Sequence, residues 1–589
     1  MMTRNEFNLL YAIKKQGIRS YRELKEDANV SIGYVSKTMK SFAQKGYIDD
    51  NGITMLGMEA LKPYKVDSAI IMAAGMSSRF VPLSLEKPKG LLQVKGEVLI
   101  ERQIEQLKAS GINNIVLVLG YKKEAFFYLE SKYDGLKLII NPEYNTKNNT
   151  YTLFLAQDHI RNSYICSSDD YFVENPFEEY VFQSYYAAQH VTEKTNEWYM
   201  VPDRKNNIAK VEKGGTEGNI MLGHVYWDQD FSASILSFIN ESNETGKYNQ
   251  DLWEQILLEN VKRLPPMNIN VYPDNTIFEF DSLDELRAFD EQYVNNTRSI
   301  IMQNISRVLN CSESDIQNFK TIKEGLTNSS FVFEVNGKEY VYRHPGEGTE
   351  KIISRKHEKT ALKLAKSVGV DPTYIYMNAD EGWKISEFVK DIRVPDYNSR
   401  EDSRRVVSVM KKLHDKKLSV DWTFMPWEEA CKIETILRGE KDGIQDQEFD
   451  ELKSNVKWCY EKCKDDGVSQ RFCHCDTYAP NWMLTDDGAT ILIDWEYAGN
   501  ADPGCDIGTY IMDSMWQVDE ADLFIKDYCG SDFNNKNRFH YLAYTALLSY
   551  YWYVWALYRE ACGAVMGESL YNWHVMAKRY SNYLVKEYK

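Results

Sequence analysis

The feature that most restricts the fold is an apolar run followed at once by a loop of small residues. Residues 67–73 (DSAIIMA) are apolar at nearly every position, which is typical of a central strand in a parallel sheet. The loop can bring backbone N–H groups close to phosphate oxygens, since a side chain at Gly75 would obstruct the approach. The loop residues expected to contact a nucleotide are Ala73, Ala74, Gly75, Ser77 and Ser78.

Two cations follow this loop. Arg79 can donate a forked pair of hydrogen bonds to phosphate oxygens, and Lys89, in a K-P-K sequence, adds a point charge. Such charges stabilise the negative charge that develops on a leaving pyrophosphate. We therefore expect Arg79 and Lys89 to take part in catalysis of nucleotidyl transfer.

The middle of the chain alternates predicted strands and helices. Beyond residues 67–73, the sequence predicts a helix at 100–109 and further strands at 114–119, at 136–140 and around 165–167. This rhythm predicts a doubly wound, Rossmann-like α/β sheet with its ligand at the carboxyl ends of the strands.

Length and charge define the remaining organisation. The 589 residues predict several domains, and we place them at 1–64, 65–295 and 296–589. The net charge of −17 argues against a nucleic-acid footprint over the whole protein, because phosphates would be repelled. Ten scattered cysteines without zinc-site spacing indicate a reduced, cytoplasmic protein.

The first segment differs from the rest in carrying slightly more basic than acidic residues. A capping-box pattern at 20–23, a cap at Ser31 and a hairpin signal within 47–56 follow an amphipathic helix. Residues 1–64 resemble the winged helix-turn-helix units of MarR-like regulators, whose third helix enters the major groove. DNA is therefore possible only through this segment, which could equally mediate dimerisation or sensing.

The middle part resembles the bacterial nucleotidyltransferases, and more closely the phosphocholine cytidylyltransferases. The resemblance rests on the A-A-G-x-x-x-R-x-x-P-L…K-P-K string and on segments at 111–126, 141–153, 167–172, 195–201 and 278–286. It implies transfer of a cytidylyl group from CTP to phosphocholine with Mg²⁺. Ser77 departs from the pattern, since many relatives have glycine there.

The resemblance also implies particular site residues. Asp169 matches the family's metal-binding Asp, and Glu254 stands where the family has a second metal-binding carboxylate, usually Asp. Trp198 matches the aromatic position that contacts the quaternary ammonium, and Trp253 could contribute to the same contact.

A second set of residues, near residue 480, is typical of phosphoryl transfer. Asp476 can accept the proton of a substrate hydroxyl, Asn481 follows five residues later to bind metal, and Asp494 can link metal to the phosphates. This spacing, just before and after a predicted strand, indicates a kinase-like site in a two-lobed α+β domain.

Further kinase-like signals lie upstream. Arg343 occupies the strand position of the phosphate-binding cation, Glu358 on the next helix is its expected ion-pair partner, and Glu387 marks the hinge that meets adenine. The loop residues expected to cover the phosphates are Thr327, Asn328 and Ser329.

Residues from about 300 to 589 resemble the choline/ethanolamine kinases and the aminoglycoside phosphotransferases. The run at 493–508 (IDWEYAGNADPGCDIG) is close to Lic-type choline kinases. The resemblance implies ATP and choline as substrates, Mg²⁺ bound by Asn481 and Asp494, and Glu496 near the ammonium group. It also implies a cation–π cage from Tyr551, Trp552 and Trp555.

Together the two sites predict a bifunctional enzyme that makes CDP-choline, for phosphocholine decoration of surface glycans or lipids. Alternatives are ethanolamine or a sugar phosphate as substrate, or a regulator that senses choline nucleotides. The uncharged run at 541–558 is rich in Tyr and Trp, so we expect a buried helix and no contact with a membrane.

Overall fold

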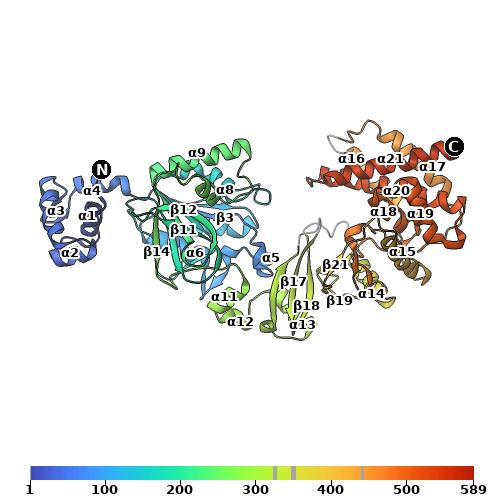
Figure 1. The fold of residues 1–589 in the computed structure, drawn as a ribbon, viewed down its shortest axis with the longest axis horizontal. Helices are drawn as coiled ribbons and strands as arrows, with labels where there is room; N and C mark the ends of the chain where they lie inside the picture. Colours follow the sequence, from blue (N-terminus) through green and yellow to red (C-terminus); the bar gives the residue numbers. More distant parts are fainter. Residues whose placement is uncertain (1, 323–327, 347–352, 440–442) are drawn as a thin grey trace. The chain divides into compact units, whose positions relative to one another are not determined.

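The structure, a computed structural model, describes residues 2–322, 328–346, 353–439 and 443–589 (Figure 1). The chain forms two compact units, Met1–Ser314 and Asp315–Lys589, which are described separately below. The predicted domain boundaries near residues 64 and 295 stay predictions, and the helix α13 (Ile300–Leu309) falls in the first unit.

The first unit begins with three short helices and a small hairpin. A capping box at Ser20 and Glu23 opens the second helix, and the Ser31 hydroxyl accepts a hydrogen bond from Tyr34 N at the start of the third, as the sequence predicts. The elements are α1 (Arg4–Gln16), α2 (Tyr21–Asp27), α3 (Ile32–Gln44), β1 (Ile48–Asp49), β2 (Gly52–Ile53) and α4 (Met55–Leu61).

Helix α1 attaches this small bundle to the sheet domain of the same unit. Tyr11 donates a hydrogen bond to Glu178 (2.7 Å), and Lys14 and Lys15 pair with Glu179 and Glu178. Phe7 packs against Phe182 with ring centroids 5.6 Å apart. The basic residues of α1 are therefore directed at the rest of the unit, whereas the side chains of Lys37 and Lys40 on α3 are exposed.

The centre of the first unit is a nine-stranded mixed sheet. Its four adjacent strands β8, β3, β6 and β7 are parallel, which confirms the strands predicted from the sequence. The sheet then continues with antiparallel strands that the sequence reading did not anticipate. The strands are β3 (Ser68–Ala73), β6 (Ile115–Leu119), β7 (Leu136–Ile140), β8 (Ser163–Ser167), β10 (Tyr185–Val191), β11 (Thr195–Pro202), β12 (Ile208–Gly215), β13 (Gly218–Trp227) and β14 (Asn268–Tyr272).

The parallel strands are buried on both faces. Ile71 of β3 packs into one core and Ile70 into another, because successive side chains of a strand point to opposite faces. This explains why residues 67–73 are apolar without alternation. Helix α6 (Leu99–Ala109) packs on one face, and α8 (Asn149–Ala156) with α9 (Gln229–Thr245) on the other.

The second unit starts with a five-stranded antiparallel sheet in the order β16-β17-β18-β20-β19. Helix α14 (Arg355–Ser367) follows and packs on β19. This sheet with one helix is the smaller lobe expected of a kinase-like fold. Its strands are β16 (Ile316–Thr321), β17 (Asn328–Val335), β18 (Lys338–Pro345), β19 (Tyr374–Met377) and β20 (Lys384–Glu387).

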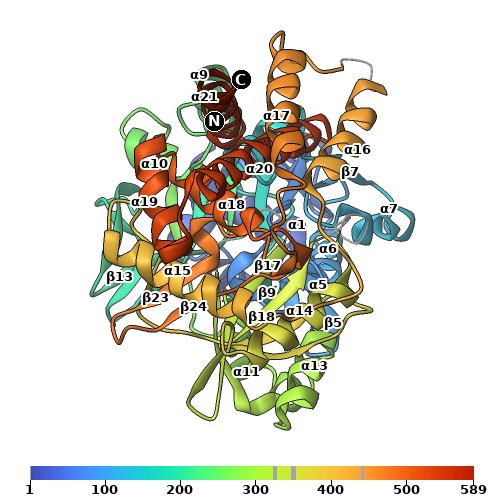
Figure 2. The same ribbon diagram turned by 90° about the vertical axis from the view of Figure 1, so that its right-hand side faces the viewer.

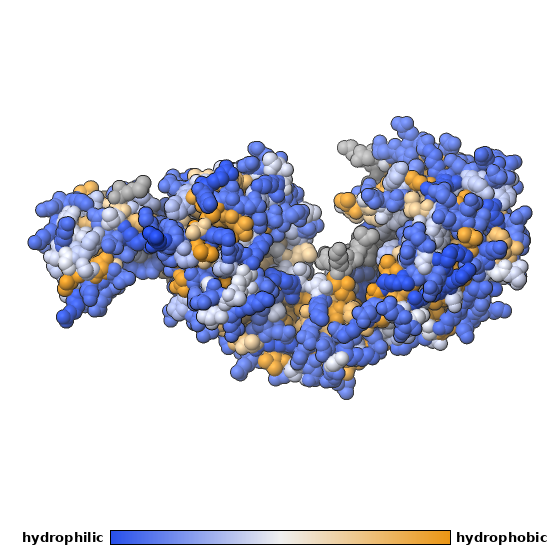
Figure 3. Space-filling view, in the orientation of Figure 1, coloured by the Kyte–Doolittle hydropathy of each residue, from blue (hydrophilic) through white to orange (hydrophobic). Residues whose placement is uncertain are grey.

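The remainder of the second unit is mostly helical. Helix α20 (Asn535–Ala561) is buried from His540 to Ala556 and contacts five other helices; it lies among the helices of this unit in Figure 2. Within the part of the chain that the structure describes, no helix holds a stretch long and apolar enough to cross a membrane. The surface in Figure 3 is mainly hydrophilic, with apolar residues in small groups. The helices around α20 are α16 (Pro426–Gly439), α17 (Phe449–Cys463), α18 (Gly504–Ser514), α19 (Val518–Cys529) and α21 (Glu568–Tyr588).

Candidate functional sites

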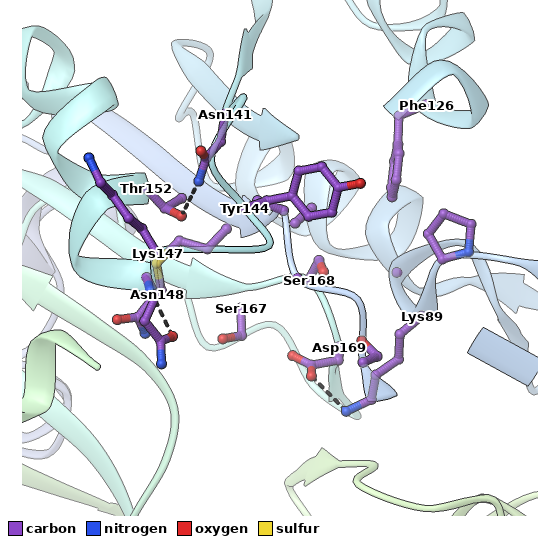
Figure 4. Close-up of a pocket in the computed structure, with 18 residues that line it drawn as sticks. Lys89, Phe126, Asn141, Tyr144, Lys147, Asn148, Thr152, Ser167, Ser168 and Asp169 are labelled. Carbon is purple, nitrogen blue, oxygen red and sulfur yellow. Dashed lines mark hydrogen bonds and ion pairs between the residues drawn. The ribbon is translucent and has the colours of Figure 1, made fainter. Parts of the chain in front are cut away.

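A cavity of about 200 Å³ opens at the carboxyl ends of β3 and β8 in the first unit (Figure 4). This is the edge of the sheet where the sequence predicts the ligand. Of the predicted residues, Ala73, Ala74, Gly75, Ser77, Lys89 and Asp169 line the cavity. Sequence reasoning missed the opposite wall, which includes Asn141, Tyr144, Asn149 and Ser167.

Lys89 and Asp169 point at each other in this cavity and form its strongest polar contact (Figure 4). The Lys89 Nζ lies 2.6 Å from Asp169 Oδ2 and 3.7 Å from Asp281 Oδ1. Burial alone would lower the pKa of Lys89, but the nearby carboxylates of Asp169, Glu279 and Asp281, Asp169 foremost, together raise it above its ordinary value. The lysine is therefore a fixed positive charge at the ligand site.

Arg79 lies outside the lining of the cavity but belongs to the same network. Its side chain is 77% exposed, and Nη1 lies 2.9 Å from Asp281 Oδ2. Asp281 therefore contacts both predicted catalytic cations.

The backbone of the loop explains the departure at Ser77. Ser77 has φ 50° and ψ 47°, in the left-handed region where glycine is favoured. A Cβ placed on Gly75 would meet no protein atom within 4 Å, so the protein leaves open space beside it. Ser77 retains the turn conformation that the family's glycine would provide, at some cost in backbone strain.

The structure adds an acidic cluster behind Lys89. Strand β15 (Ile277–Glu279) pairs with β9 (Asp170–Phe172) so that Glu279 lies opposite Asp170. Both carboxylate oxygens of Asp170 are buried without a hydrogen-bond partner among the described residues. Burial, reinforced by Glu279, raises the pKa of Asp170, and burial with Asp169 nearby raises the pKa of Glu279 to about 8.

Asp281 and Glu279 carry a weak sequence signal. They lie in the segment FEFD, two residues apart next to a short strand, within a run already recognised as similar to the cytidylyltransferases. The sequence alone does not reveal that β15 pairs with β9, which is what brings these two carboxylates to Asp169.

Three other predicted residues lie away from the lining of this cavity. Glu254 is half-buried, and its Oε1 accepts a hydrogen bond from Tyr186 (3.1 Å); burial of its carboxylate raises its pKa to about 7. Trp253 is buried in the core, with its ring 4.9 Å from that of Trp227. Trp198, on β11, carries Lys213 Nζ over its ring at 4.2 Å. Their predicted roles stay predictions.

A larger cavity of about 520 Å³ lies in the second unit, between its sheet and its helices. It brings together residues from β17, β18, β20, the loops around β23 (Trp482–Thr485), and α20 and α21. The predicted residues that line it are Asn328, Arg343, Glu387, Asp476, Asn481, Asp494, Glu496, Trp552 and Trp555.

The loop that carries Asp476 is held rigidly. Asn481 Nδ2 donates to Asp476 Oδ2 (3.1 Å), and the buried Asp506 accepts hydrogen bonds from the backbone N–H groups of His474 and Cys475. Burial raises the pKa of Asp476, and Asp494 adds to the effect. Asp494 has φ 69°, and such conformations at ligand sites are maintained by the surrounding packing.

Arg343 forms the predicted ion pair with Glu358. Its Nη1 lies 2.6 Å from Glu358 Oε1, and Nη2 lies 2.8 Å from Oε2. Burial disfavours the charged form of Glu358, but Arg343 outweighs it and lowers the Glu358 pKa to about 2. Two further cations join the network: Arg355 contacts Glu358 and Glu496, and Lys384 contacts Glu358 and Asp494.

Aromatic rings form one wall of the second cavity. The Trp552 and Trp555 rings lie 5.5 Å apart at 77°, and Trp573 of α21 lies 5.8 Å from Trp552. Tyr497 stands edge-on to Trp552 at 5.3 Å. Trp573 and Tyr497 were not predicted, whereas Tyr551 is buried beside Phe424 and is not part of the lining.

The other predicted kinase-site residues are placed as follows. Ser330 lines the cavity where Ser329 was expected. Glu358 does not line the cavity but forms an ion pair with Arg343, which does. Glu387 pairs with Lys338 at the rim. Thr327 lies outside the described residues.

Two family models match the chain. The MobA-like NTP transferase domain matches residues 69–202, and the choline/ethanolamine kinase family matches residues 319–544. The first match covers the strands around Asp169, and the second covers the loop of Asp476 and part of α20.

Curated relatives agree with this division. Choline-phosphate cytidylyltransferase of Streptococcus pneumoniae is 35% identical over 223 residues, which are 38% of this chain and 96% of the relative. 2-Aminoethylphosphonate cytidylyltransferase of Lancefieldella rimae is 32% identical over 239 residues (39% and 95%). Protein LicA of Haemophilus influenzae is 25% identical over 257 residues (41% and 94%). The chain therefore belongs to the cytidylyltransferase family of the first two relatives, joined in one polypeptide to a choline/ethanolamine kinase segment.

Proposed function

We propose that this chain makes CDP-choline in two steps. The second unit phosphorylates choline with ATP, and the first unit transfers a cytidylyl group from CTP to the phosphocholine and releases pyrophosphate. The observation that carries the proposal is that each unit holds its own complete polar site: Lys89 with Asp169 in one, Asp476 with Asn481 and Asp494 in the other. Joining them raises the local concentration of the intermediate.

In the first site, the chain's own residues bind and orient the nucleotide. Backbone N–H groups of the loop at 73–78 face the triphosphate, Lys89 and Arg79 neutralise its charge, and Asp169 with Asp281 would hold Mg²⁺. These two carboxylates suit Mg²⁺, which prefers oxygen ligands. The buried oxygens of the adjacent Asp170, which have no hydrogen-bond partner among the described residues, also support a cation here. When bound, the ion supplies charge stabilisation at the reacting phosphate.

In the second site, Asp476 accepts the proton of the choline hydroxyl. Its raised pKa brings the carboxylate closer to the range of an effective general base. Asn481 and Asp494 would hold Mg²⁺, which suits their oxygen donors. The wall of Trp552, Trp555 and Trp573, with Glu496 nearby, offers aromatic faces and a negative charge to a quaternary ammonium.

A coupled assay tests the proposal. The purified chain with choline, ATP, CTP and Mg²⁺ should release ADP and pyrophosphate and accumulate CDP-choline. Absence of CDP-choline from a folded protein would falsify the proposal, and omission of CTP should leave phosphocholine as the end product.

A substrate panel distinguishes the other acceptors. Ethanolamine should be a poorer substrate than choline for the kinase step, because a primary ammonium interacts less favourably with the three indole rings of the second site. 2-Aminoethylphosphonate and a sugar phosphate would compete with phosphocholine for the cytidylyl step of the first unit, and we expect both to be poorer acceptors. A preference for any of these compounds over choline or phosphocholine would change the proposed acceptor. The proposed reaction types, phosphoryl transfer and cytidylyl transfer, would stay the same.

We propose further that residues 2–61 form a winged helix-turn-helix that contacts DNA through α3. The exposed Lys37 and Lys40 on α3 support this role, since the lysines of α1 are paired with Glu178 and Glu179. Binding of duplex DNA should weaken as salt rises, because phosphate contacts release counterions. Binding that is absent at low salt would favour a purely structural role of the segment.

A further inference from the structure

We propose that Lys384, rather than Arg343, is the side chain that contacts the triphosphate of the nucleotide in the second site. This assignment rests on the proposed kinase function. The sequence predicts that Arg343 makes both the ion pair with Glu358 and the phosphate contact, and we now assign these contacts to two residues. Arg343 then keeps the helix α14 in place through Glu358, and Lys384 supplies the positive charge to the phosphate oxygens.

The terminal donors of Arg343 are already occupied. Its two Nη atoms carry four N–H groups, and four acceptor contacts meet them. Glu358 takes one from each nitrogen, at 2.6 and 2.8 Å, Asp494 Oδ1 lies 3.1 Å from Nη1, and the Gly382 carbonyl lies 3.4 Å from Nη2. A phosphate contact would therefore require breaking one of these.

The remaining donor of Arg343 is buried. Its Nε has no partner among the described residues. The side chain lines the cavity but is only 5% exposed, and its terminal nitrogens are held by Glu358.

Lys384 is held less tightly. It stands directly opposite Arg343 on the neighbouring strand, also lines the cavity, and is 12% exposed. Its Nζ lies 3.4 Å from Asp494 Oδ1 and 3.5 Å from Glu358 Oε1, both longer than the contacts of Arg343 with the same two oxygens (3.1 and 2.6 Å). Because an ammonium on a flexible stem has three donors, Lys384 can turn toward a phosphate while Arg343 keeps Glu358 in place.

Equilibrium binding to the full chain tests the assignment. Lys384→Met should weaken ATP binding by about 10- to 100-fold, the usual effect of removing a charged hydrogen-bonding partner, and leave adenosine binding within about twofold. Lys384→Arg should recover most of the ATP affinity. Lys356→Met on α14, an exposed lysine, is the matched control and should bind both ligands normally.

Two outcomes would overturn the assignment: unchanged ATP affinity in Lys384→Met, or an equal loss for ATP and adenosine, which indicates a structural role. Cytidylyl transfer by the same variant should be normal and reports that the first unit is folded, while unchanged adenosine binding reports that the second unit is folded. Because binding is measured without turnover, the assignment stands or falls independently of the proposed kinase reaction. Absence of ADP release by the unaltered chain with choline would count against that reaction alone.

Discussion

The two sites of this chain use buried cations in different ways. In the first unit, one lysine, Lys89, meets Asp169 closely and Asp281 more loosely, and the exposed Arg79 completes the group. In the second unit, Arg343, Arg355 and Lys384 interlock with Glu358, Asp494 and Glu496. The first site depends on one buried cation, whereas the second distributes positive charge over three.

This difference has a consequence for substitutions. Substitution of Lys89 leaves Asp169 without its buried cation, whereas in the second site Glu358 and Asp494 each contact more than one cation. Since each site draws its polar residues from one unit, substitutions should separate the two half-reactions.

The largest effect is expected for Asp476→Asn. Loss of the general base should lower the ATP-dependent step by about 10²- to 10⁴-fold, because the substrate hydroxyl loses its proton acceptor. Release of ADP with choline measures this step, and release of pyrophosphate from CTP with added phosphocholine should be unchanged. Parallel loss of both steps in a folded protein would contradict separate sites.

Lys89→Met should have the next largest effect. Removal of the buried Lys89 cation from the first site should lower cytidylyl transfer by about 10²- to 10³-fold, since the other lysine that lines the cavity, Lys147, pairs with Glu143 and not with Asp169. Pyrophosphate release is the measurement, with ADP release unchanged. Lys137→Met, an exposed lysine on β7, is the control and should keep both rates; a mild effect of Lys89→Met would show that Arg79 suffices.

Trp573→Ala tests the indole ring that only the structure adds to the aromatic wall of the second cavity. Loss of one indole face should raise KM for choline by about 3- to 30-fold and affect ethanolamine less. Trp573→Phe should restore part of the affinity, and Tyr571→Ala, an exposed residue on the same helix, should have no effect. An equal rise of KM for both alcohols would mean that Trp573 acts through packing.

The smallest effect is expected for Ser77→Gly. Relief of the left-handed conformation should stabilise the first unit by about 1 kcal/mol, which corresponds to about 2–4 °C in its thermal transition. Differential scanning calorimetry measures the shift. Ser78→Gly, at the start of a helical turn with ordinary geometry, should lower the transition instead; no shift in Ser77→Gly would show that the loop bears no strain.

Much of the fold could be predicted from local patterns. The run at 114–119 predicted β6, the run at 136–140 predicted β7, and both lie in the parallel part of the sheet. The extension of the sheet by β10 to β14, antiparallel except for the parallel pair β10–β14, was missed because much of its pairing joins strands that are distant in the sequence and leaves no local signal. A buried strand and an edge strand of a mixed sheet can have similar composition.

The site residues also fall into two groups, those predictable from local sequence patterns and those placed by tertiary structure. Asp476, Asn481 and Asp494 were predictable because their roles are tied to a short spacing around one strand. Asp281, Lys384 and Trp573 were not, because strand register or helix packing places each of them. Glu279 faces Asp170 across β15 and β9, Lys384 faces Arg343 across β20 and β18, and α21 packs on α20.

The sequence by itself therefore determined which reactions this protein can perform, since nucleotide loops and phosphotransfer motifs are local arrangements of a few residues. Tertiary structure decided which of its many carboxylates, lysines and tryptophans join those motifs. The physical reason is that burial and strand register depend on contacts between residues that are far apart in the sequence. They place Asp281 against Lys89 and Arg79, close Arg343 on Glu358, and bring Trp573 to the same wall as Trp552.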